Sequence, residues 1–204
     1  MRLGIIGAGR VGGTLGRLWE AQGHDVRFGV RDKSKDAGGG LPSERTVSVA
    51  EAGAFGDVIV LATPWSGTPN AVRAAGDLKG KTVIDCTNPL LPDFSALAVG
   101  LTTSAAEEIA KLIPTAHVVK CFNTLGASNF ANPEFGGERA SMFFCGDDAS
   151  AKLTVAELGK QLGFDMVDAG PLLQARTLEP MALLWITMAM KYGGSTRSAF
   201  RLLR

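Results

Sequence analysis

The chain has 204 residues, of which 46% are hydrophobic and 20% are charged, and its 21 basic and 20 acidic side chains give a formal net charge of +1. This composition is typical of a soluble globular protein with one domain, or one domain and a small appendage. The balanced charge leaves no basic stripe for a phosphate backbone, so we expect no nucleic-acid partner.

Signals for export or membrane insertion are missing from the sequence pattern. Residues 1–10 end in a glycine loop rather than a cleavage site, and the longest apolar run, residues 181–190, is about half the roughly 20 residues that span a bilayer. Cys86, Cys121 and Cys145 lie far apart and form no CxxC pair, which fits buried, reduced thiols. We therefore expect a cytoplasmic protein without membrane contact.

The first 30 residues predict a strand, a glycine turn, a helix and a second strand. Residues 3–6 are apolar, and residues 10–21 carry apolar side chains at close to helical spacing. Gly23 supplies a helix stop, and residues 25–30 alternate as a strand would. A βαβ unit therefore closes within about 30 residues, with the right-handed crossover that such units adopt.

Strands and helices alternate along the rest of the chain. Residues 31–45 are polar and glycine-rich, which predicts a surface loop. Further strands are expected at residues 46–49, 57–62, 81–85, 117–122, 140–145 and 165–168, and helices at 66–76, 104–113 and 149–162, with a long helix from residue 172 onward. The helix at 104–113 opens with the capping-box pattern of Ser104 and Glu107.

These elements predict an α/β fold of the Rossmann type. We expect a doubly wound, mostly parallel sheet with a small α/β carboxyl-terminal part that ends in a long helix. The expected domains are a Rossmann domain at residues 1–145 and a small subdomain packed on it at residues 146–204.

A glycine fingerprint between the first strand and the first helix predicts dinucleotide binding. It matches G-x-G-x-x-G and consists of Gly7, Ala8, Gly9, Arg10, Val11 and Gly12. Gly7 permits the tight turn, Gly9 lets the backbone approach a pyrophosphate at the helix amino end, and Gly12 allows close helix–sheet packing.

The end of the second strand favours NADP over NAD. Val30 is followed by Arg31, with Lys33 and Lys35 behind it, and a cation at this place accommodates the 2′-phosphate of NADP. Asp32 leaves a ribose contact, and hence NAD, as an alternative.

Three further loops follow strands and should lie at the same carboxyl edge of the sheet, where ligands bind in open α/β folds. The candidates in these loops are Ala62, Thr63, Pro64 and Trp65, then Asn88 and Pro89, and finally Asn123, Leu125, Gly126 and Ala127. Their Thr and Asn side chains either line the nicotinamide site or simply form turns.

No residue is assigned as a catalytic acid, and no metal site is expected. His24 and His117 precede their strands and so belong to the opposite edge, and Tyr192 has no lysine four residues on. Lys120 and Asp85 lie near the carboxyl edge but within apolar strands. Because a ketone needs a proton as well as a hydride, this pattern points to a flavin-like acceptor that is reprotonated from solvent.

Several segments together resemble a known family, the NADP oxidoreductases that use the deazaflavin coenzyme F-420, whose amino-terminal fold is shared with the NADPH domain of six-transmembrane ferric reductases. They are residues 7–12, 29–31, 62–65, 83–89, 118–127 and 168–172 with 178–180. Family members commonly carry a serine where this chain has Val30.

The resemblance implies bound NADPH and a small-molecule hydride acceptor, either coenzyme F-420 or a flavin. Arg31 and Lys35 would hold the 2′-phosphate, residues 8–11 the pyrophosphate, and the Thr63–Pro64 and Asn88 loops the nicotinamide. The deazaflavin ring would stack near residues 123–127. Positioning of the two reactants is then the main catalytic device.

Other interpretations remain open. A β-hydroxyacid-type dehydrogenase shares the fingerprint but usually carries a large helical domain, whereas only about 60 residues follow Cys145 here. A reductase of a small carbonyl substrate and an NADPH-binding redox sensor without turnover are further alternatives. The apolar residues 181–190 would serve as a docking surface, a homodimer interface or a core helix.

Overall fold

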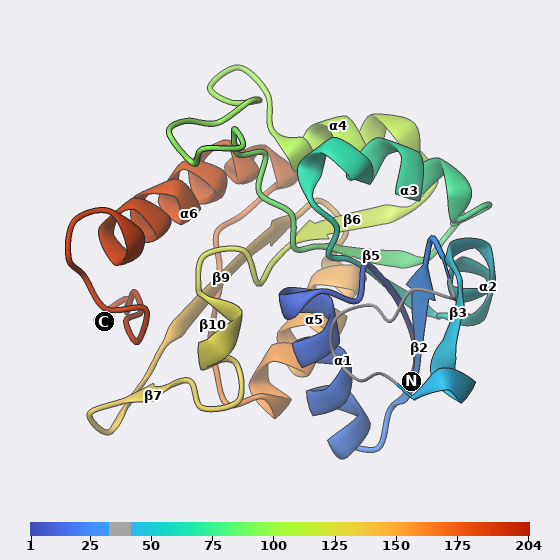
Figure 1. Ribbon diagram of the computed structural model, residues 1–204, viewed down its shortest axis with the longest axis horizontal. Helices are drawn as coiled ribbons and strands as arrows, with labels where there is room; N and C mark the ends of the chain where they lie inside the picture. The colour runs from blue at the N-terminus through green and yellow to red at the C-terminus, as the bar shows by residue number, and fades with distance from the viewer. Residues whose placement is uncertain (33–41) are drawn as a thin grey trace.

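The computed structural model describes residues 1–32 and 42–204, and its centre is an eight-stranded sheet (Figure 1). The strand order is β10-β9-β6-β5-β4-β1-β2-β3. The strands are β1 (Arg2–Ile6), β2 (Asp25–Val30), β3 (Thr46–Ser48), β4 (Val58–Leu61), β5 (Thr82–Asp85), β6 (His117–Lys120), β9 (Ser141–Gly146) and β10 (Asp165–Asp168). The first six are mutually parallel, whereas β9 runs antiparallel to β6 and β10 is parallel to β9. The predicted Rossmann-type, mostly parallel sheet is confirmed.

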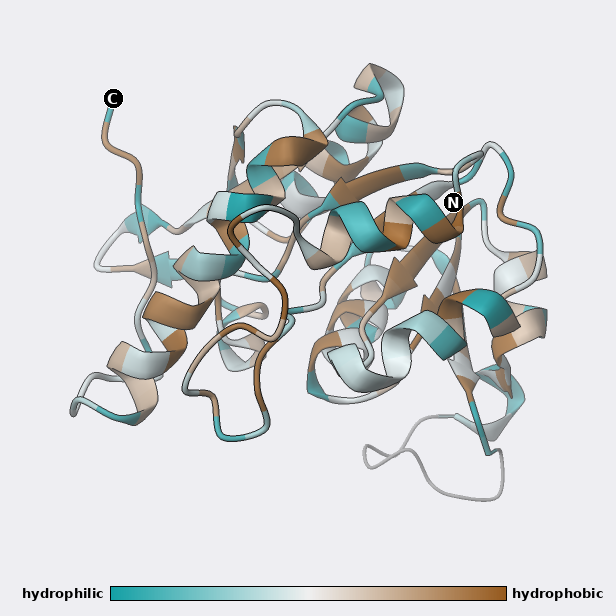
Figure 2. Ribbon diagram, turned by 90° about the horizontal axis from the view of Figure 1, so that it is seen from above, coloured by the Kyte–Doolittle hydropathy of each residue, from teal (hydrophilic) through white to brown (hydrophobic). Residues whose placement is uncertain are grey.

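Helices cover both faces of the sheet. They are α1 (Arg10–Ala21), α2 (Val49–Phe55), α3 (Thr68–Ala74), α4 (Ala105–Leu112), α5 (Ala149–Gln161) and α6 (Ala175–Met190). One hydrophobic cluster joins α1 and α5 to the sheet, and a second joins α2, α3, α4 and the start of α6 to its other face. Figure 2 shows the mainly hydrophobic strands enclosed between helices that carry hydrophilic residues on their outer sides.

The central strands are continuous apolar runs because helices cover both faces of the sheet, so side chains on both sides of each strand are buried. All four residues of β4 are buried, as are four of the five in β1. The order of the strands places β2 on one side of β1 and β4 on the other. The chain therefore changes direction across the sheet between β1 and β4, and this is the switch point at which ligands bind in such folds.

Some elements differ from the sequence prediction. Helix α2, with a complete capping box between Ser48 and Glu51, and the small hairpin of β7 (Glu134–Phe135) and β8 (Glu138–Arg139) were not anticipated. The predicted long carboxyl-terminal helix is confirmed, but α6 stops at Met190 and does not continue to the end of the chain. Gly193 has a φ of +70°, and the Gly194 N–H donates to the Met188 carbonyl, which turns the chain away from the helix.

The carboxyl-terminal segment is continuous with the rest of the fold. Strand β10 extends the same sheet through β9, and α5 packs on the same face as α1. The boundary expected near residue 145 stays a prediction. Within residues 1–32 and 42–204, no helix is both long enough and apolar enough to cross a membrane.

Candidate functional site

A cleft of about 560 Å³ opens at the switch point between β1 and β4. Its walls come from the carboxyl ends of β1, β2 and β4 and from the starts of α2 and α3. The lining residues are Ile6, Gly7, Ala8, Gly9, Gly29, Val30, Arg31, Asp32, Val49, Ala62, Thr63, Pro64, Ser66, Gly67, Asn70 and Ala71. Eight of the residues expected at the cofactor are thus gathered in one cleft, namely Gly7, Ala8, Gly9, Val30, Arg31, Ala62, Thr63 and Pro64.

The three fingerprint glycines have different physical roles. A Cβ on Gly7, whose φ is +99°, would lie 2.7 Å from the Ala62 backbone, and a Cβ on Gly12 would lie 2.0 Å from the Gly7 carbonyl oxygen. A Cβ on Gly9 would meet nothing within 4 Å. Gly7 and Gly12 are therefore required by packing, whereas the open space beside Gly9 is room for a ligand at the amino end of α1.

Arg31 and Asp32 form the β2 side of the cleft, and both side chains are exposed. The structure thus brings an exposed guanidinium to the end of the second strand, as expected, and its contact with a 2′-phosphate stays a prediction. Lys33 and Lys35 lie outside the described residues. Arg10 and Val11, at the start of α1, and Trp65, which packs against the α3 and α4 side of the core, do not line this cleft. Their cofactor contacts stay predictions.

Threonine hydroxyls shape the β4 side of the cleft. Thr63 Oγ1 lies 2.8 Å from Thr68 Oγ1, and the Thr68 hydroxyl donates to the Pro64 carbonyl at 3.1 Å. This pair fixes the turn from β4 into α3. The cleft residues at the starts of α2 and α3, such as Val49 and Asn70, were missed from the sequence. The rule that ligands lie beyond strand ends would have pointed to Val49, which directly follows β3.

The loops after β5 and β6 are tied together by their asparagines. Asn88 Nδ2 donates to the Asn123 carbonyl at 3.0 Å, and Asn123 Nδ2 donates to Asn88 Oδ1 at 3.2 Å. Asn123 Nδ2 also donates to the Leu178 carbonyl of α6 at 3.1 Å. Within the described part of the chain, two buried side-chain oxygens lack a hydrogen-bond partner, Thr87 Oγ1 and Asn123 Oδ1, and both belong to these loops.

The segment expected at the acceptor, residues 123–127, lies under helix α6. Leu125 is buried, while Gly126 and Ala127 are partly exposed. A Cβ on Gly126 would lie 2.5 Å from Trp185 Cη2, so the indole of Trp185 sits directly on this glycine. Trp185 was missed from the sequence, because nothing in a run of apolar helix residues shows which of them turns toward the loop.

Three buried charged side chains lie beneath these loops. Lys120 Nζ is 2.8 Å from both Asp85 Oδ2 and Glu179 Oε1 and donates to the Thr87 carbonyl at 2.5 Å. None of the three residues is exposed to solvent. Burial by itself would lower the pKa of Lys120, but the two carboxylates outweigh it and raise that pKa above 10.5. Burial also raises the pKa of Glu179 above its ordinary value of 4.5.

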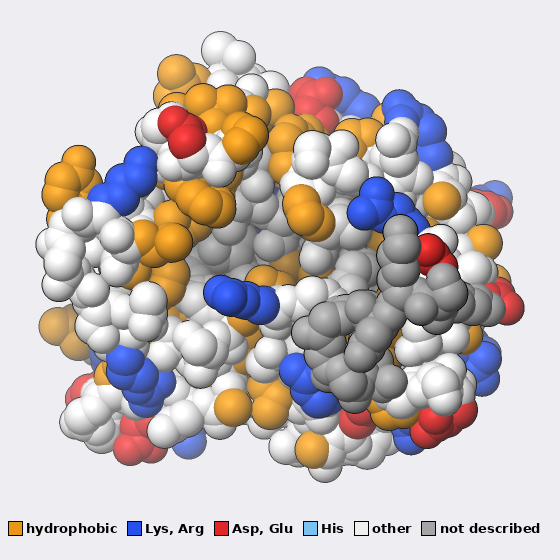
Figure 3. All heavy atoms as spheres, viewed as in Figure 1, with side chains coloured by type: hydrophobic (Ala, Val, Ile, Leu, Met, Phe, Trp, Pro, Cys, Tyr) orange, Lys and Arg blue, Asp and Glu red, His pale blue; other side chains and the backbone are white. Residues whose placement is uncertain are grey.

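Hydrophobic side chains are exposed on α6 and on the loop after β5. In Figure 3 the surface is hollowed beside α6, and hydrophobic side chains gather along that side of the hollow. The exposed large hydrophobic side chains include Leu91 and Phe94 in the loop after β5 and Leu184, Met188 and Met190 on α6. Lys191 Nζ donates to the Phe94 carbonyl at 3.4 Å and so joins the end of α6 to the loop after β5.

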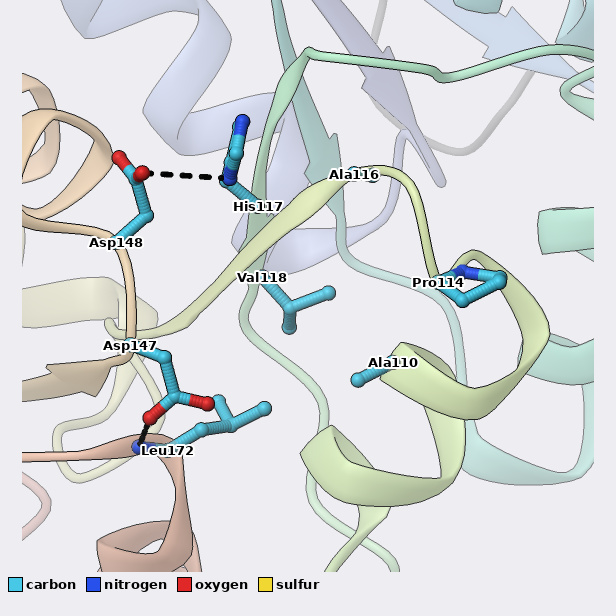
Figure 4. A pocket seen from close by; sticks show the side chains of 8 residues that line it. All are labelled: Ala110, Pro114, Ala116, His117, Val118, Asp147, Asp148 and Leu172. Atoms are coloured by element: carbon cyan, nitrogen blue, oxygen red, sulfur yellow. Dashed lines mark hydrogen bonds and ion pairs between the residues drawn. The ribbon is translucent and has the colours of Figure 1, made fainter.

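A second pocket, of about 360 Å³, lies at the opposite edge of the sheet (Figure 4). His117 Nδ1 there is 3.5 Å from Asp148 Oδ2, Asp147 accepts from the Leu172 N–H, and Asp148 caps α5. His24 is also remote from the cleft and contacts Gln161. Both histidines therefore have structural partners away from the cleft at the switch point.

Comparison with known proteins identifies relatives over the whole chain. The model of the family "NADP oxidoreductase coenzyme F-420-dependent" matches residues 2–89. A crystal structure of a putative F-420-dependent NADP reductase from an Arthrobacter species is 32% identical, with 100% of each chain covered and a TM-score of 0.89. A hypothetical protein from Sinorhizobium meliloti is 27% identical, with 100% of this chain and 95% of that chain covered and a TM-score of 0.71.

Curated relatives include metalloreductases. The rat metalloreductase STEAP3 is 32% identical over 184 residues, which are 89% of this chain and 36% of that protein. Human STEAP2 is 32% identical over 113 residues, or 54% of this chain and 21% of the relative. The chain thus spans about a third or less of the length of these relatives. A reductive aminase from Aspergillus terreus, 19% identical with 94% of this chain and 62% of that chain covered and a TM-score of 0.66, shares the fold.

Proposed function

The chain belongs to the family of coenzyme F-420-dependent NADP oxidoreductases, and on that premise we propose that it transfers hydride between NADPH and a deazaflavin or flavin-like acceptor. The adenosine end of NADPH would lie at Arg31, the pyrophosphate at Gly9, and the nicotinamide toward the ends of β4 and β5. The acceptor ring would lie against residues 123–127. Bound NADPH supplies the hydride from the C4 carbon of its nicotinamide.

The observation that carries this choice of acceptor is the buried state of Asp85, Lys120 and Glu179. These ionisable side chains lie directly below the acceptor-side loops, yet they bind one another and have no exposed surface. A reductase of a carbonyl substrate needs a group that delivers a proton to the new alkoxide. These three side chains are closed off from that task, which favours a ring that takes up its proton from solvent.

Two features of the site support the placement of the nicotinamide. The space beside Gly9 admits a backbone approach to pyrophosphate, and a dinucleotide anchored there crosses the switch point toward β4 and β5. The hydroxyl of Thr87 and the side-chain carbonyl of Asn123 lack partners, and one donor with one acceptor is the complement of a carboxamide. Thr63, Asn88 and these two groups would orient the ring.

The decisive experiment is NADPH oxidation, with NADH in parallel, against coenzyme F-420, FMN, FAD, riboflavin and ferric chelates. Turnover with F-420 alone supports a deazaflavin reductase, and turnover with FMN, FAD or riboflavin supports a flavin reductase on the same scaffold. If NADPH binds and none of these acceptors is reduced, the proposal fails. The redox sensor without turnover, or a reductase of a small carbonyl substrate, then takes its place.

Contact between two copies through α6 also stays a proposal. Leu184, Met188 and Met190 expose between 50% and 63% of their surface, more than a helix that is buried within one chain would leave open. Sedimentation velocity over a range of protein concentrations would test it. A single species with the mass of one chain at all concentrations would contradict a homodimer.

A further inference from the structure

The charged cluster below the acceptor loops is part of a closed circuit of hydrogen bonds. Lys120 donates to the Thr87 carbonyl, and Asp85 Oδ1 accepts from the Thr87 N–H at 2.8 Å, so Thr87, the second residue after β5, is held at both its backbone N–H and its carbonyl. The next residue, Asn88, pairs with Asn123 in both directions. The loop after β5 is therefore fixed to the ends of both β5 and β6.

Helix α6 closes the circuit through two consecutive residues. The Leu178 carbonyl accepts from Asn123 Nδ2, and the Glu179 carboxylate pairs with Lys120. Glu179 also accepts from the Ala105 and Ala106 N–H groups at 3.0 and 3.2 Å. One carboxylate thus joins the amino end of α4, the end of β6 and the helix that carries Trp185 over Gly126.

A buried cluster of this kind contributes precise orientation of its neighbours more than it contributes stability. Removing two carboxylates and an ammonium from water is costly, and buried ion pairs add little stability compared with well-packed apolar side chains. Their distinctive property is direction, because Lys120 uses its three N–H donors on three fixed acceptors. Hydride transfer depends on such precision, since the reacting atoms must be held about 3–3.5 Å apart.

We propose that Lys120 is a positioning residue for hydride transfer and that it acts together with Asp85 and Glu179. The three side chains hold the Thr87–Asn88 and Asn123 loops in a fixed position relative to helix α6. This role rests on the proposed function, because those loops would meet the nicotinamide and the acceptor. The three side chains touch neither reactant. They act through the Thr87 carbonyl, the Asn123 amide and the backbone of α6.

The test compares Glu179→Gln with the native chain. Glutamine keeps the size of the side chain and removes the charge that faces Lys120, while Asp85 continues to neutralise the ammonium. We expect NADPH affinity to stay within about twofold, because the adenosine and pyrophosphate contacts lie across the switch point. The maximal rate of hydride transfer, measured with whichever acceptor of the panel the native chain reduces, should fall on the order of tenfold. The KM for NADPH should be nearly unchanged.

A second readout needs no acceptor. The fluorescence of bound NADPH reports the surroundings of the nicotinamide, and in Glu179→Gln it should move toward the intensity and lifetime of free NADPH. If no acceptor is reduced by the native chain, the proposed function fails, but this comparison still decides the positioning role. Asp85→Asn, which keeps an acceptor for the Thr87 N–H, replaces Glu179→Gln if the latter does not fold.

Arg176→Met is the matched control. The guanidinium of Arg176 also joins α6 to α4, through Glu107 at 2.6 Å, but it does so near the surface and outside the circuit. A general loosening of the two helices should lower Tm in the control as in Glu179→Gln. Only the circuit variants should change the nicotinamide emission and the hydride-transfer rate. Unchanged emission and rate in folded Glu179→Gln, or equal changes in Arg176→Met, would overturn the proposal.

Discussion

The indole of Trp185 rests on Gly126, so closely that a Cβ on this glycine would come within 2.5 Å of the ring. Trp185 belongs to α6, and its Nε1 donates to the Ser198 carbonyl at 3.0 Å, which ties the ring to the tail after α6. The acceptor loop, the carboxyl-terminal helix and the tail after it are therefore interlocked at one residue without a side chain.

Gly126→Ala should disturb this contact without touching the dinucleotide cleft. The added methyl group must displace the indole, and overpacking of this kind costs roughly 1–3 kcal/mol. We expect NADPH affinity to be unchanged and turnover of the acceptor to fall several-fold. The emission of Trp185, assigned by comparison with Trp185→Phe, should shift. Native turnover together with a native emission spectrum would show that the contact is not close enough to matter.

Arg31→Ala should weaken NADPH much more than NADH. The loss of one charge-assisted contact to the 2′-phosphate costs about 1.5–3 kcal/mol, or about 10- to 100-fold in affinity, and NADH lacks that phosphate. Titration calorimetry with both nucleotides measures the difference. Arg27→Ala is the control, since Arg27 also lies on β2 but packs over the Phe55 ring at 4.3 Å. Equal weakening of both nucleotides by Arg31→Ala would remove its role in recognising phosphate.

Gly9→Val should remove NADPH binding and leave the fold intact, whereas Gly12→Val should destabilise the fold itself. The valine at position 9 enters open space with a φ of −74°, so the chain should fold with a nearly native Tm while NADPH binding is lost by more than about 100-fold. The valine at position 12 would meet the Gly7 carbonyl, which should unfold or strongly destabilise the protein. Thermal melts and nucleotide titration distinguish the two. Native binding by folded Gly9→Val would contradict the role given to the fingerprint.

Glu107 should make part of the stability depend on pH. Its hydrogen bonds with the Arg176 guanidinium hold the pKa of Glu107 below its ordinary value of 4.5. Because the folded state favours the ionised form, the stabilisation is fully present above the unfolded pKa and is lost as pH falls through the lower folded value. The free energies of unfolding of the native chain and Glu107→Gln, measured by urea denaturation, should therefore differ most at neutral pH, and the difference should shrink as the pH falls below the ordinary carboxyl pKa of 4.5. A constant difference would rule out this linkage.

Local sequence determined the dinucleotide half of the fold. Gly7, Gly9 and Gly12 follow an apolar strand and precede a periodic helix, and each of these signals is contained within a few neighbouring residues. The rule that parallel strands end at one edge then brought Thr63 and Arg31 to a common cleft, as the structure shows. Helix α2 was missed because four of its seven residues are alanine or glycine, so its sequence shows no clear apolar stripe.

Only the tertiary structure decided what lies beneath the acceptor loops. From sequence alone Lys120 and Asp85 are two polar residues at the ends of separate apolar strands, and Glu179 is one charge on a predicted helix. Pairing of β5 with β6 sets Asp85 opposite Lys120, and the packing of α6 on α4 brings Glu179 to the same point. A buried charge is tolerable only with its partners, and those partners are assembled by strand register and helix packing, which no local pattern records.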